Sequence, residues 1–165
     1  MPLYDPLNRC IDYLRISVTD RCNLSCVYCK PRERMKALPH DEILTYEEIL
    51  RLVSVAVPLG ISRLRITGGE PLIRRGILDF ISSLHALDGV EDISLTTNGV
   101  LLEEMAPGLL AAGISRLNIS LDSLDARRFR EITGSDGWDR VWRGISRAEA
   151  LGFSPIKINM VPVRG

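Results

Sequence analysis

The residues best suited to chemistry lie in one short segment, CNLSCVYC, at positions 22–29. It contains Cys22, Cys26 and Cys29, three of the chain's four cysteines, in C-x3-C-x2-C spacing. Cysteines this close together indicate a metal site. Structural zinc and fully ligated iron–sulfur clusters both normally take four protein ligands. Three thiolates therefore favour an iron–sulfur cluster in which one iron is left open for a ligand from outside the chain.

The fourth cysteine, Cys10, comes before a strand predicted over about 12–19, whereas the other three follow that strand. A strand of this length spans roughly 25 Å at ~3.3 Å per residue, which places Cys10 at the opposite end of the fold. We interpret it as a small buried apolar residue. Neither histidine of the chain, His40 or His85, has the spacing of a metal ligand.

Strands that could position the cysteine segment are indicated by a recurring pattern. A glycine is followed by three linking residues and then by alternating apolar and polar residues, which is typical of a strand after a helix end. The pattern begins at Gly60, Gly89, Gly113 and Gly152, and LRISVT at 14–19 alternates without the glycine. The sequence therefore predicts five strands.

Helical patterns fill the gaps between these strands. Thr45 and Glu48 form a capping box before ILRLVSVAV, and LDFISSLHAL has amphipathic spacing. LLEEMAPGLLAA is a weaker pattern that Pro107 is expected to kink or break, and WDRVWRGISRAEAL runs up to Gly152. Strands joined by helical crossovers are expected to be parallel, with right-handed connections.

The two faces of the predicted strands differ in polarity. The apolar face carries Leu14, Ile16, Val18, Leu64, Ile66, Ile93, Leu95, Leu117, Ile119, Leu121, Ile156, Ile158 and Met160. The other face carries Arg15, Ser17, Thr19, Arg65, Thr67, Ser94, Thr96, Asn118, Ser120, Asp122, Lys157 and Asn159. A doubly wound sheet and a filled eight-stranded barrel both need apolar residues where these are polar. An antiparallel sheet with one wet face is a further alternative, although the intervening helices argue against it. We expect an α/β fold that is a partial, open parallel β/α barrel, ending after about five strands and enclosing a polar lumen.

Three cations point into this expected lumen, namely Arg15, Arg65 and Lys157, with Asp122 near one end. The chain as a whole is neutral, with 21 basic and 21 acidic residues. A neutral chain that gathers cations in one cavity is suited to binding an anion there, and the arginine fork matches phosphate oxygens.

Chemistry-bearing loops follow four of the strands, at the edge where parallel β/α folds place their sites. They are the cysteine segment, GGEP at 68–71, TNG at 97–99 and LDSLD at 121–125. Each has a simpler interpretation. Gly-Gly can be a tight turn, Asp125 can cap a helix, and Tyr28 can be a packing residue. Their shared location is what favours a site.

These segments resemble one enzyme family. CNLSCVYC and GGEP are similar to the cluster and cofactor motifs of radical S-adenosylmethionine (SAM) enzymes. The strings LRISVTDRCNLSCVYC, RITGGEPL, LTTNGVLL and LNISLDSLD resemble the GTP 3′,8-cyclase family of molybdenum cofactor biosynthesis along nearly the whole chain. The resemblance implies that Cys22, Cys26 and Cys29 hold a 4Fe–4S cluster. It further assigns SAM contacts to Tyr28, Gly69 and Ser120, and GTP contacts to Arg15, Arg65, Thr96 and Lys157.

The resemblance also implies an activity. GTP would be converted to 3′,8-cyclo-7,8-dihydro-GTP, with release of 5′-deoxyadenosine and methionine, after hydrogen abstraction from the ribose 3′ carbon and attack on guanine carbon 8. No catalytic residue is implied beyond those that hold the cluster and the substrate. A low-potential electron donor and the downstream cyclic pyranopterin monophosphate synthase would be partners, and a homodimer is compatible.

Family members are about twice as long and carry a second cysteine trio for a second cluster, together with a Gly-Gly tail. We therefore expect residues 1–165 to be an incomplete radical SAM core domain from the N-terminal part of a longer protein, inactive alone. Two alternatives stay open at this point. One is another radical SAM enzyme, such as one that modifies peptides, and the other is a zinc-binding or iron-sensing module without catalysis.

Composition bears on the binding partners and the cellular location of the protein. The balanced charge gives no indication of nucleic-acid or membrane-surface binding, and no apolar run is long enough to span a bilayer. The first residues lack the apolar core of a signal peptide. We therefore expect a cytoplasmic protein, in which clustered cysteines indicate metal or redox chemistry.

Overall fold

Each of the five alternating segments forms a strand in the computed structural model, which describes residues 3–29 and 38–162. The strands are β1 (Tyr13–Ser17), β2 (Arg63–Thr67), β3 (Asp92–Thr97), β4 (Arg116–Ser120) and β5 (Ile156–Asn159). They pair in parallel and in sequence order, β1-β2-β3-β4-β5. This open parallel sheet confirms the predicted fold class and excludes the antiparallel alternative.

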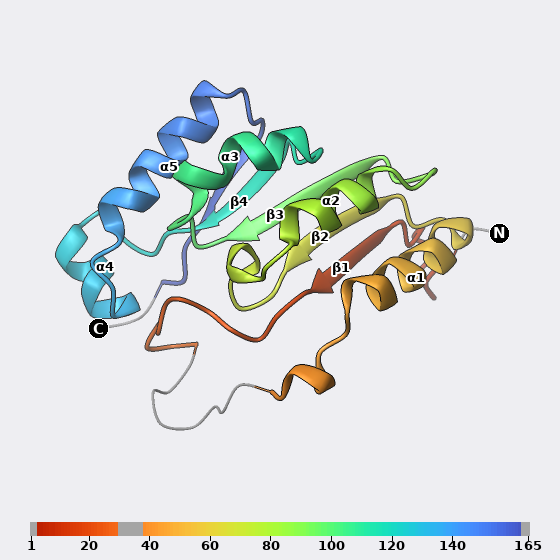
Figure 1. The fold of residues 1–165 in the computed structure, drawn as a ribbon, viewed down its shortest axis with the longest axis horizontal. Coiled ribbons are helices and arrows are strands. Elements are labelled where there is room, and N and C mark those ends of the chain that lie inside the picture. Colours follow the sequence, from red (N-terminus) through yellow and green to blue (C-terminus); the bar gives the residue numbers. More distant parts are fainter. Residues whose placement is uncertain (1–2, 30–37, 163–165) are drawn as a thin grey trace.

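Five helices connect the strands. They are α1 (Tyr46–Ala56), α2 (Ile77–His85), α3 (Leu102–Ala111), α4 (Ala126–Thr133) and α5 (Trp138–Ala150), with 3-10 turns η1 (His40–Glu42), η2 (Val57–Leu59) and η3 (Pro71–Ile73). Figure 1 shows α1, α2 and α3 lying side by side over one face of the sheet. The capping box predicted for α1 is confirmed, because Thr45 Oγ1 accepts from the Glu48 backbone N–H and Glu48 Oε2 accepts from that of Thr45.

Two helical features differ from the prediction. Pro107 lies inside α3 without breaking it, and its exposed side chain does not interrupt the packing of Ala106 and Leu109 on the sheet. The short helix α4 was not among the predicted helices, although the sequence analysis allows Asp125 to cap a helix at this point. Asp125 is indeed the cap, since its Oδ1 accepts the Arg128 backbone N–H at 2.8 Å.

The hydrophobic core lies between the helices and the apolar face of the strands. The central strands contribute almost fully buried residues, namely Leu64, Ile66, Ile93, Leu95, Leu117 and Ile119. The prediction for the last strand is wrong in one respect, because Ile158 and Met160 remain 49% and 61% exposed. β5 is the outer strand of the sheet and α5 packs mainly against α3, so no described helix covers these two side chains.

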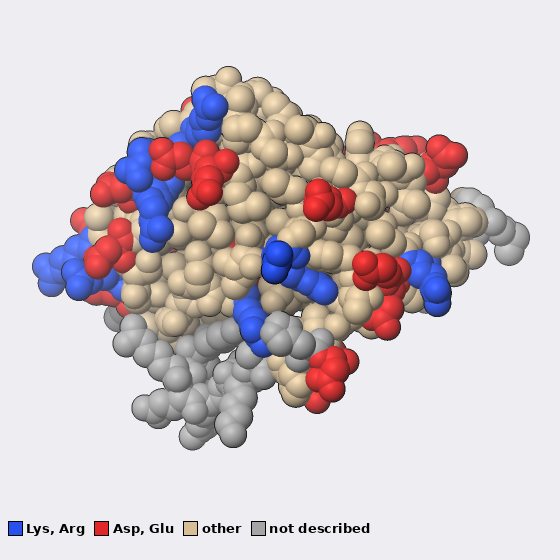
Figure 2. Space-filling model, in the orientation of Figure 1, with Lys and Arg blue, Asp and Glu red and all other residues tan. Residues whose placement is uncertain are grey.

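The outer surface carries charges of both signs. Figure 2 shows Lys and Arg side chains interspersed with Asp and Glu over the helix-covered face, in keeping with a formal net charge of zero. Within residues 3–29 and 38–162, none of the helices combines the length and the hydropathy needed to cross a bilayer.

Candidate active site at the carboxyl ends of the strands

A cavity of about 270 Å³ opens at the carboxyl ends of the strands. Residues that the sequence analysis singled out supply much of its lining: Arg15, Cys22, Cys26, Tyr28, Cys29, Gly69, Thr96, Ser120 and Asp122. All three clustered cysteines and all three predicted SAM contacts are therefore brought together. Two predicted GTP contacts, Arg65 and Lys157, do not line this cavity, although they lie on the same face of the sheet.

The cysteine loop after β1 is held by a helix far along the chain. The backbone N–H groups of Ser25 and Val27 donate to the carbonyls of Thr133 and Ile132 in α4, each at 2.9 Å. The Tyr28 hydroxyl donates to Asp122 Oδ2 at 2.6 Å, and burial together with this bond raises the pKa of Tyr28. The loop is thus fixed by the β4–α4 region, which sequence spacing alone does not reveal.

All three thiols line the cavity, and none of them forms a disulfide bond in the structure. Cys22 Sγ accepts from the Leu24 backbone N–H at 3.4 Å and from Asn98 Nδ2 at 3.7 Å. Burial, followed by Asp122 and the neighbouring thiols, raises the pKa of Cys26 to about 11. Metal binding at Cys26 therefore displaces a proton.

The three thiols bear on two kinds of metal site, a single zinc ion and a multi-iron cluster. Among the described residues, no group of three or more His, Cys, Asp or Glu side chains is arranged to hold a single metal ion. A tetrahedral zinc site would bring its sulfurs to about 3.8 Å from one another, given Zn–S bonds of about 2.3 Å. A multi-iron cluster binds each cysteine to a different iron and so holds the sulfurs farther apart. Three thiols that line one cavity match the three protein ligands of a cluster with one open iron.

The Gly-Gly pair of GGEP allows two backbones to meet. Gly69 N–H donates to Thr19 O at 2.6 Å, and Glu70 N–H donates to Arg21 O at 2.8 Å. A Cβ on Gly69 would lie 2.2 Å from Arg21 O, and one on Gly68, whose φ is +149°, would lie 2.5 Å from Thr19 O. The glycines therefore hold the start of the cysteine loop against the β2 loop while also lining the cavity.

Glu70, the third residue of the motif, is a buried carboxylate only 1% exposed. It accepts from Leu72 N–H at 3.1 Å, from the Thr97 hydroxyl at 2.8 Å and from Asn98 N–H at 2.6 Å. Burial raises the pKa of Glu70, and these three hydrogen bonds oppose that shift. The carboxylate thus joins the β2 loop to the β3 loop, a role that the sequence analysis did not identify.

Glu70 should impose a pH dependence on stability. Because its pKa is raised above the usual value of 4.5 in the folded state, its contribution to stability is full below that pH. The contribution is lost as pH rises through the folded-state pKa. We expect the difference in unfolding free energy between the parent and Glu70→Gln to fall over that range in urea titrations. Parallel curves for the two proteins would contradict this assignment.

Strand register places further cations on the polar face. Arg15 pairs with Arg65 across β1 and β2, and Lys157 pairs with Asn118 across β4 and β5. Arg63 and Arg116 occupy the same face but are neutralised by Asp12 and Asp92, respectively.

Those two ion pairs are short, at 2.6 Å for Arg63–Asp12 and 2.8 Å for Arg116–Asp92. By contrast, Arg15, Arg65 and Lys157 form no salt bridge within the part of the chain that the structure describes. Arg65 donates to Ser94 Oγ at 3.4 Å and lies 5.4 Å from the centre of the Tyr13 ring. The three cations therefore lie on the polar face without a salt-bridge partner among the described residues, and Arg15 and Lys157 are exposed there.

Cys10 takes no part in this site, and its predicted burial is wrong. It is exposed and forms an isolated antiparallel bridge with Tyr4. The bridge belongs to the N-terminal segment that precedes β1, where Ile11 N–H donates to Leu3 O at 2.8 Å. A position at the surface, ahead of the amino end of β1, leaves Cys10 outside the core and away from the other cysteines.

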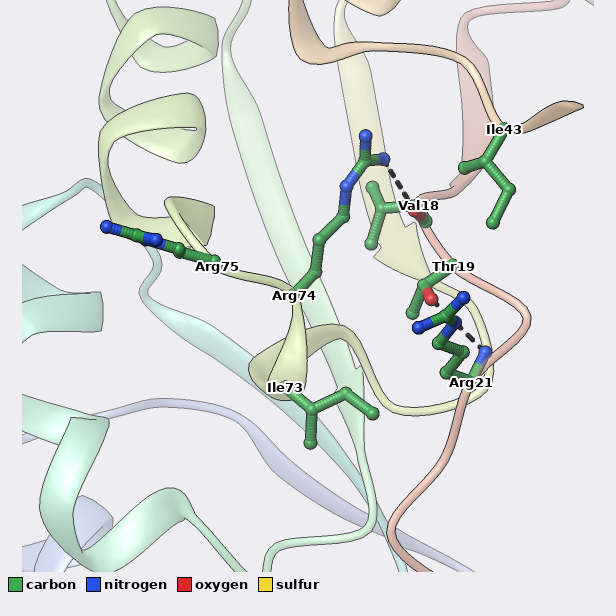
Figure 3. A pocket seen from close by; sticks show the side chains of 7 residues that line it. All are labelled: Val18, Thr19, Arg21, Ile43, Ile73, Arg74 and Arg75. Atoms are coloured by element: carbon green, nitrogen blue, oxygen red, sulfur yellow. Dashed lines mark hydrogen bonds between the residues drawn. The ribbon is translucent and has the colours of Figure 1, made fainter. Parts of the chain in front are cut away.

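A second cavity, of about 360 Å³, is larger but contains none of the predicted site residues. Figure 3 shows Arg74 reaching from the β2–α2 connection to the end of β1, while Arg75 points away. Arg74 donates to the carbonyls of Val18 and Leu44 and stacks 4.1 Å over the Tyr46 ring. This arginine is therefore occupied in fastening β1 to the segment before α1.

Comparisons with known proteins agree with this geometry. Over 162 residues the chain is 54% identical to the GTP 3′,8-cyclase of Thermodesulfovibrio yellowstonii, covering 98% of this chain and 50% of that protein. It is 54% identical over 165 residues to the GTP 3′,8-cyclase of Geobacter sulfurreducens, covering 100% of this chain and 51% of that protein. The chain thus spans about half the length of the curated relatives it matches.

Solved structures share the fold. SuiB of Streptococcus suis bound to S-adenosylmethionine superposes with a TM-score of 0.73 at 24% identity, covering 93% of this chain and 35% of that one. A tagged anSMEcpe with bound AdoMet gives a TM-score of 0.68 at 21% identity, covering 90% of this chain and 42% of that one.

The family model described as the Radical SAM superfamily matches residues 16–165. Membership of that superfamily implies a 4Fe–4S cluster and S-adenosylmethionine as cofactors. With this match over most of its length, the chain belongs to the radical SAM superfamily.

Proposed function

We propose that this chain is the core of a GTP 3′,8-cyclase, which carries out the first step of molybdenum cofactor biosynthesis. The observation that supports this most is the cavity shared by three thiols, the proposed SAM contacts and two of the proposed GTP contacts. The identity of 54% to proteins of that name favours this activity over others of the superfamily. The reaction would convert GTP to 3′,8-cyclo-7,8-dihydro-GTP and release 5′-deoxyadenosine and methionine.

The proposed cluster ligands are Cys22, Cys26 and Cys29. Their fit rests on their free thiols, on a common cavity and on the N–H groups directed at Cys22 Sγ. Thiolates are the protein ligands that iron–sulfur clusters take, and three of them leave one iron for an external ligand. When bound, the cluster would supply the electron that cleaves the sulfonium of S-adenosylmethionine.

The proposed SAM contacts are Tyr28, Gly69 and Ser120, which line the cavity together with the thiols. Gly69 presents backbone rather than a side chain to this space, so a ligand can approach the main chain closely. The Tyr28 ring is held by its bond to Asp122. These residues would orient the cofactor beside the thiols.

The proposed GTP contacts are Arg15, Arg65, Thr96 and Lys157. Arg15 and Thr96 line the cavity itself, whereas Arg65 and Lys157 extend the positive charge along the same face. Uncompensated arginine and lysine side chains are suited to the triphosphate of GTP, which carries several negative charges.

Residues 1–165 would form an incomplete radical SAM core domain, and the relatives are about twice as long. A second cluster, a low-potential electron donor, cyclic pyranopterin monophosphate synthase as the next enzyme, and a homodimer belong to the same proposal. Oxygen-sensitive thiolate ligands are suited to the reducing cytoplasm.

The test is GTP binding to the anaerobically reconstituted full-length protein, because residues 1–165 alone are expected to be inactive. Arg65→Ala and Lys157→Ala should each weaken GTP binding roughly tenfold or more, because each removes a charge-assisted contact. Cleavage of S-adenosylmethionine should remain measurable in both variants. Isothermal titration calorimetry measures the first effect and detection of 5′-deoxyadenosine the second.

Arg63→Ala is the matched control. Arg63 lies on β2, two residues from Arg65 and on the same face, but Asp12 already neutralises it. GTP affinity should therefore stay within about twofold of the parent, since an exposed ion pair contributes little. Unchanged affinity in both test variants, or an equal loss in the control, would refute the placement of GTP. Binding of a peptide instead of GTP would favour a peptide-modifying enzyme.

A further inference from the structure

The side-chain amide of Asn98 is held in one orientation. Asn98 lies in the loop after β3, is 8% exposed, and accepts the Val100 backbone N–H on Oδ1 at 3.0 Å. Its own backbone N–H donates to Glu70 Oε2 at 2.6 Å. Because the Val100 N–H can only donate, the amide oxygen must face it. The amide nitrogen is therefore turned toward the other side of the loop.

On that other side lies the cysteine loop. Asn98 Nδ2 is 2.7 Å from Asn23 Oδ1 and 3.7 Å from Cys22 Sγ. An amide nitrogen carries two hydrogens, so it can donate to both acceptors at once. The β3 loop is thereby joined to the first of the three cysteines by a donor that cannot rotate away without breaking the bond from Val100.

We infer that Asn98 is a positioning residue that donates a hydrogen bond to the Cys22 thiolate and raises the reduction potential of the cluster bound there. An N–H dipole directed at a ligating sulfur stabilises its negative charge. That charge increases when the cluster gains an electron, so the bond favours the reduced state. The inference rests on the proposed function, in which Cys22 is a cluster ligand.

Burial makes this donor effective. With 8% of Asn98 exposed, little water competes for the amide, and the buried Glu70 carboxylate holds the adjoining backbone. Hydrogen bonds are electrostatically stronger in such a low-dielectric environment than in water. The hydrogen bonds between Glu70 and Asn98 and between Asn98 and Cys22 thus link the GGEP motif to the cluster through the TNG motif.

The test is a redox titration of the reconstituted protein, followed by electron paramagnetic resonance. The signal that changes on addition of S-adenosylmethionine identifies the cluster under study. Asn98→Ala removes the donor and should lower the equilibrium constant for reduction about tenfold, a shift of about 59 mV to lower potential. Asn98→Ser should shift in the same direction, because its hydroxyl can still cap the turn but is too short to reach Cys22.

Thr97→Val is the matched control for a loosened loop. It removes the hydroxyl that donates to Glu70 and accepts from Gly99 N–H, but leaves the Asn98 amide in place. Its potential should stay close to that of the parent.

Iron and sulfide analysis of the parent is done first. A parent that assembles no cluster refutes the proposed function itself. A cluster whose potential is unchanged in Asn98→Ser and in any Asn98→Ala protein that assembles it overturns the inference about Asn98 alone. An equal shift in Thr97→Val also overturns that inference, because the effect would then come from loop order and not from the donor.

Discussion

Cys26→Ser should leave the protein unable to assemble its cluster. Cys26 is the middle of three thiols around one cavity, and a serine hydroxyl is a poor ligand for iron in such clusters. After anaerobic reconstitution, the parent should contain about four iron and four sulfide per cluster at this site, whereas the variant should retain little of either. Colorimetric iron and sulfide analysis, together with the visible absorption of the cluster, measures the difference.

Cys10→Ser is the control for that experiment. Cys10 is exposed, is paired with Tyr4 and does not line the cavity, so the variant should bind as much iron and sulfide as the parent. The assignment fails if Cys26→Ser retains the cluster. It also fails if the variant takes up iron without sulfide, which is the behaviour of a single-ion site.

Gly69→Ala should disrupt the site without touching a thiol. The added methyl group would lie 2.2 Å from the carbonyl oxygen of Arg21, which is backbone and cannot rotate aside. The β2 loop and the cysteine loop would have to separate, breaking hydrogen bonds that join Gly69 to Thr19 and Glu70 to Arg21. We expect a loss of roughly 1–3 kcal/mol in unfolding free energy, as in overpacked interiors, and strongly reduced cluster assembly.

Gly137→Ala is the matched control for this substitution. Gly137 has a φ of −79°, and its added methyl group would lie 3.2 Å from a serine hydroxyl that can rotate. Its unfolding free energy should change much less than that of Gly69→Ala. Urea denaturation of both variants decides the question, and equal stability of Gly69→Ala and the parent would show that the two loops are not held together at Gly69.

Local patterns in the sequence are sufficient to predict most of the fold. The glycine before each alternating segment adopts a left-handed conformation in the structure, with φ between 87° and 102° at Gly60, Gly89, Gly113 and Gly152. A left-handed backbone conformation favours glycine, so these positions can be recognised from the residue type. The prediction for β5 failed at Ile158 because burial depends on the neighbours of a strand, and an outer strand has fewer of them.

The contacts that organise the site were harder to predict. Glu70 and Asn98 belong to motifs that the sequence singles out, but their partners lie on other loops. The short helix α4 holds the cysteine loop through carbonyl groups of its last residues. Every residue type has such a carbonyl, so the sequence does not reveal which ones accept these hydrogen bonds. Alternation and spacing report on one segment at a time, whereas these contacts join segments that are distant in sequence.

The anchoring of the cysteine loop by α4 has a consequence for the order of biosynthesis. The loop at residues 22–29 leaves the ribosome more than a hundred residues before its last anchor at Thr133. Until that anchor emerges, a nascent chain holds three reduced thiols without the backbone bonds that arrange them. Iron and sulfide delivered during translation would therefore reach a cysteine loop that is not yet arranged to bind them. Assembly of the metal centre is expected to follow synthesis of α4.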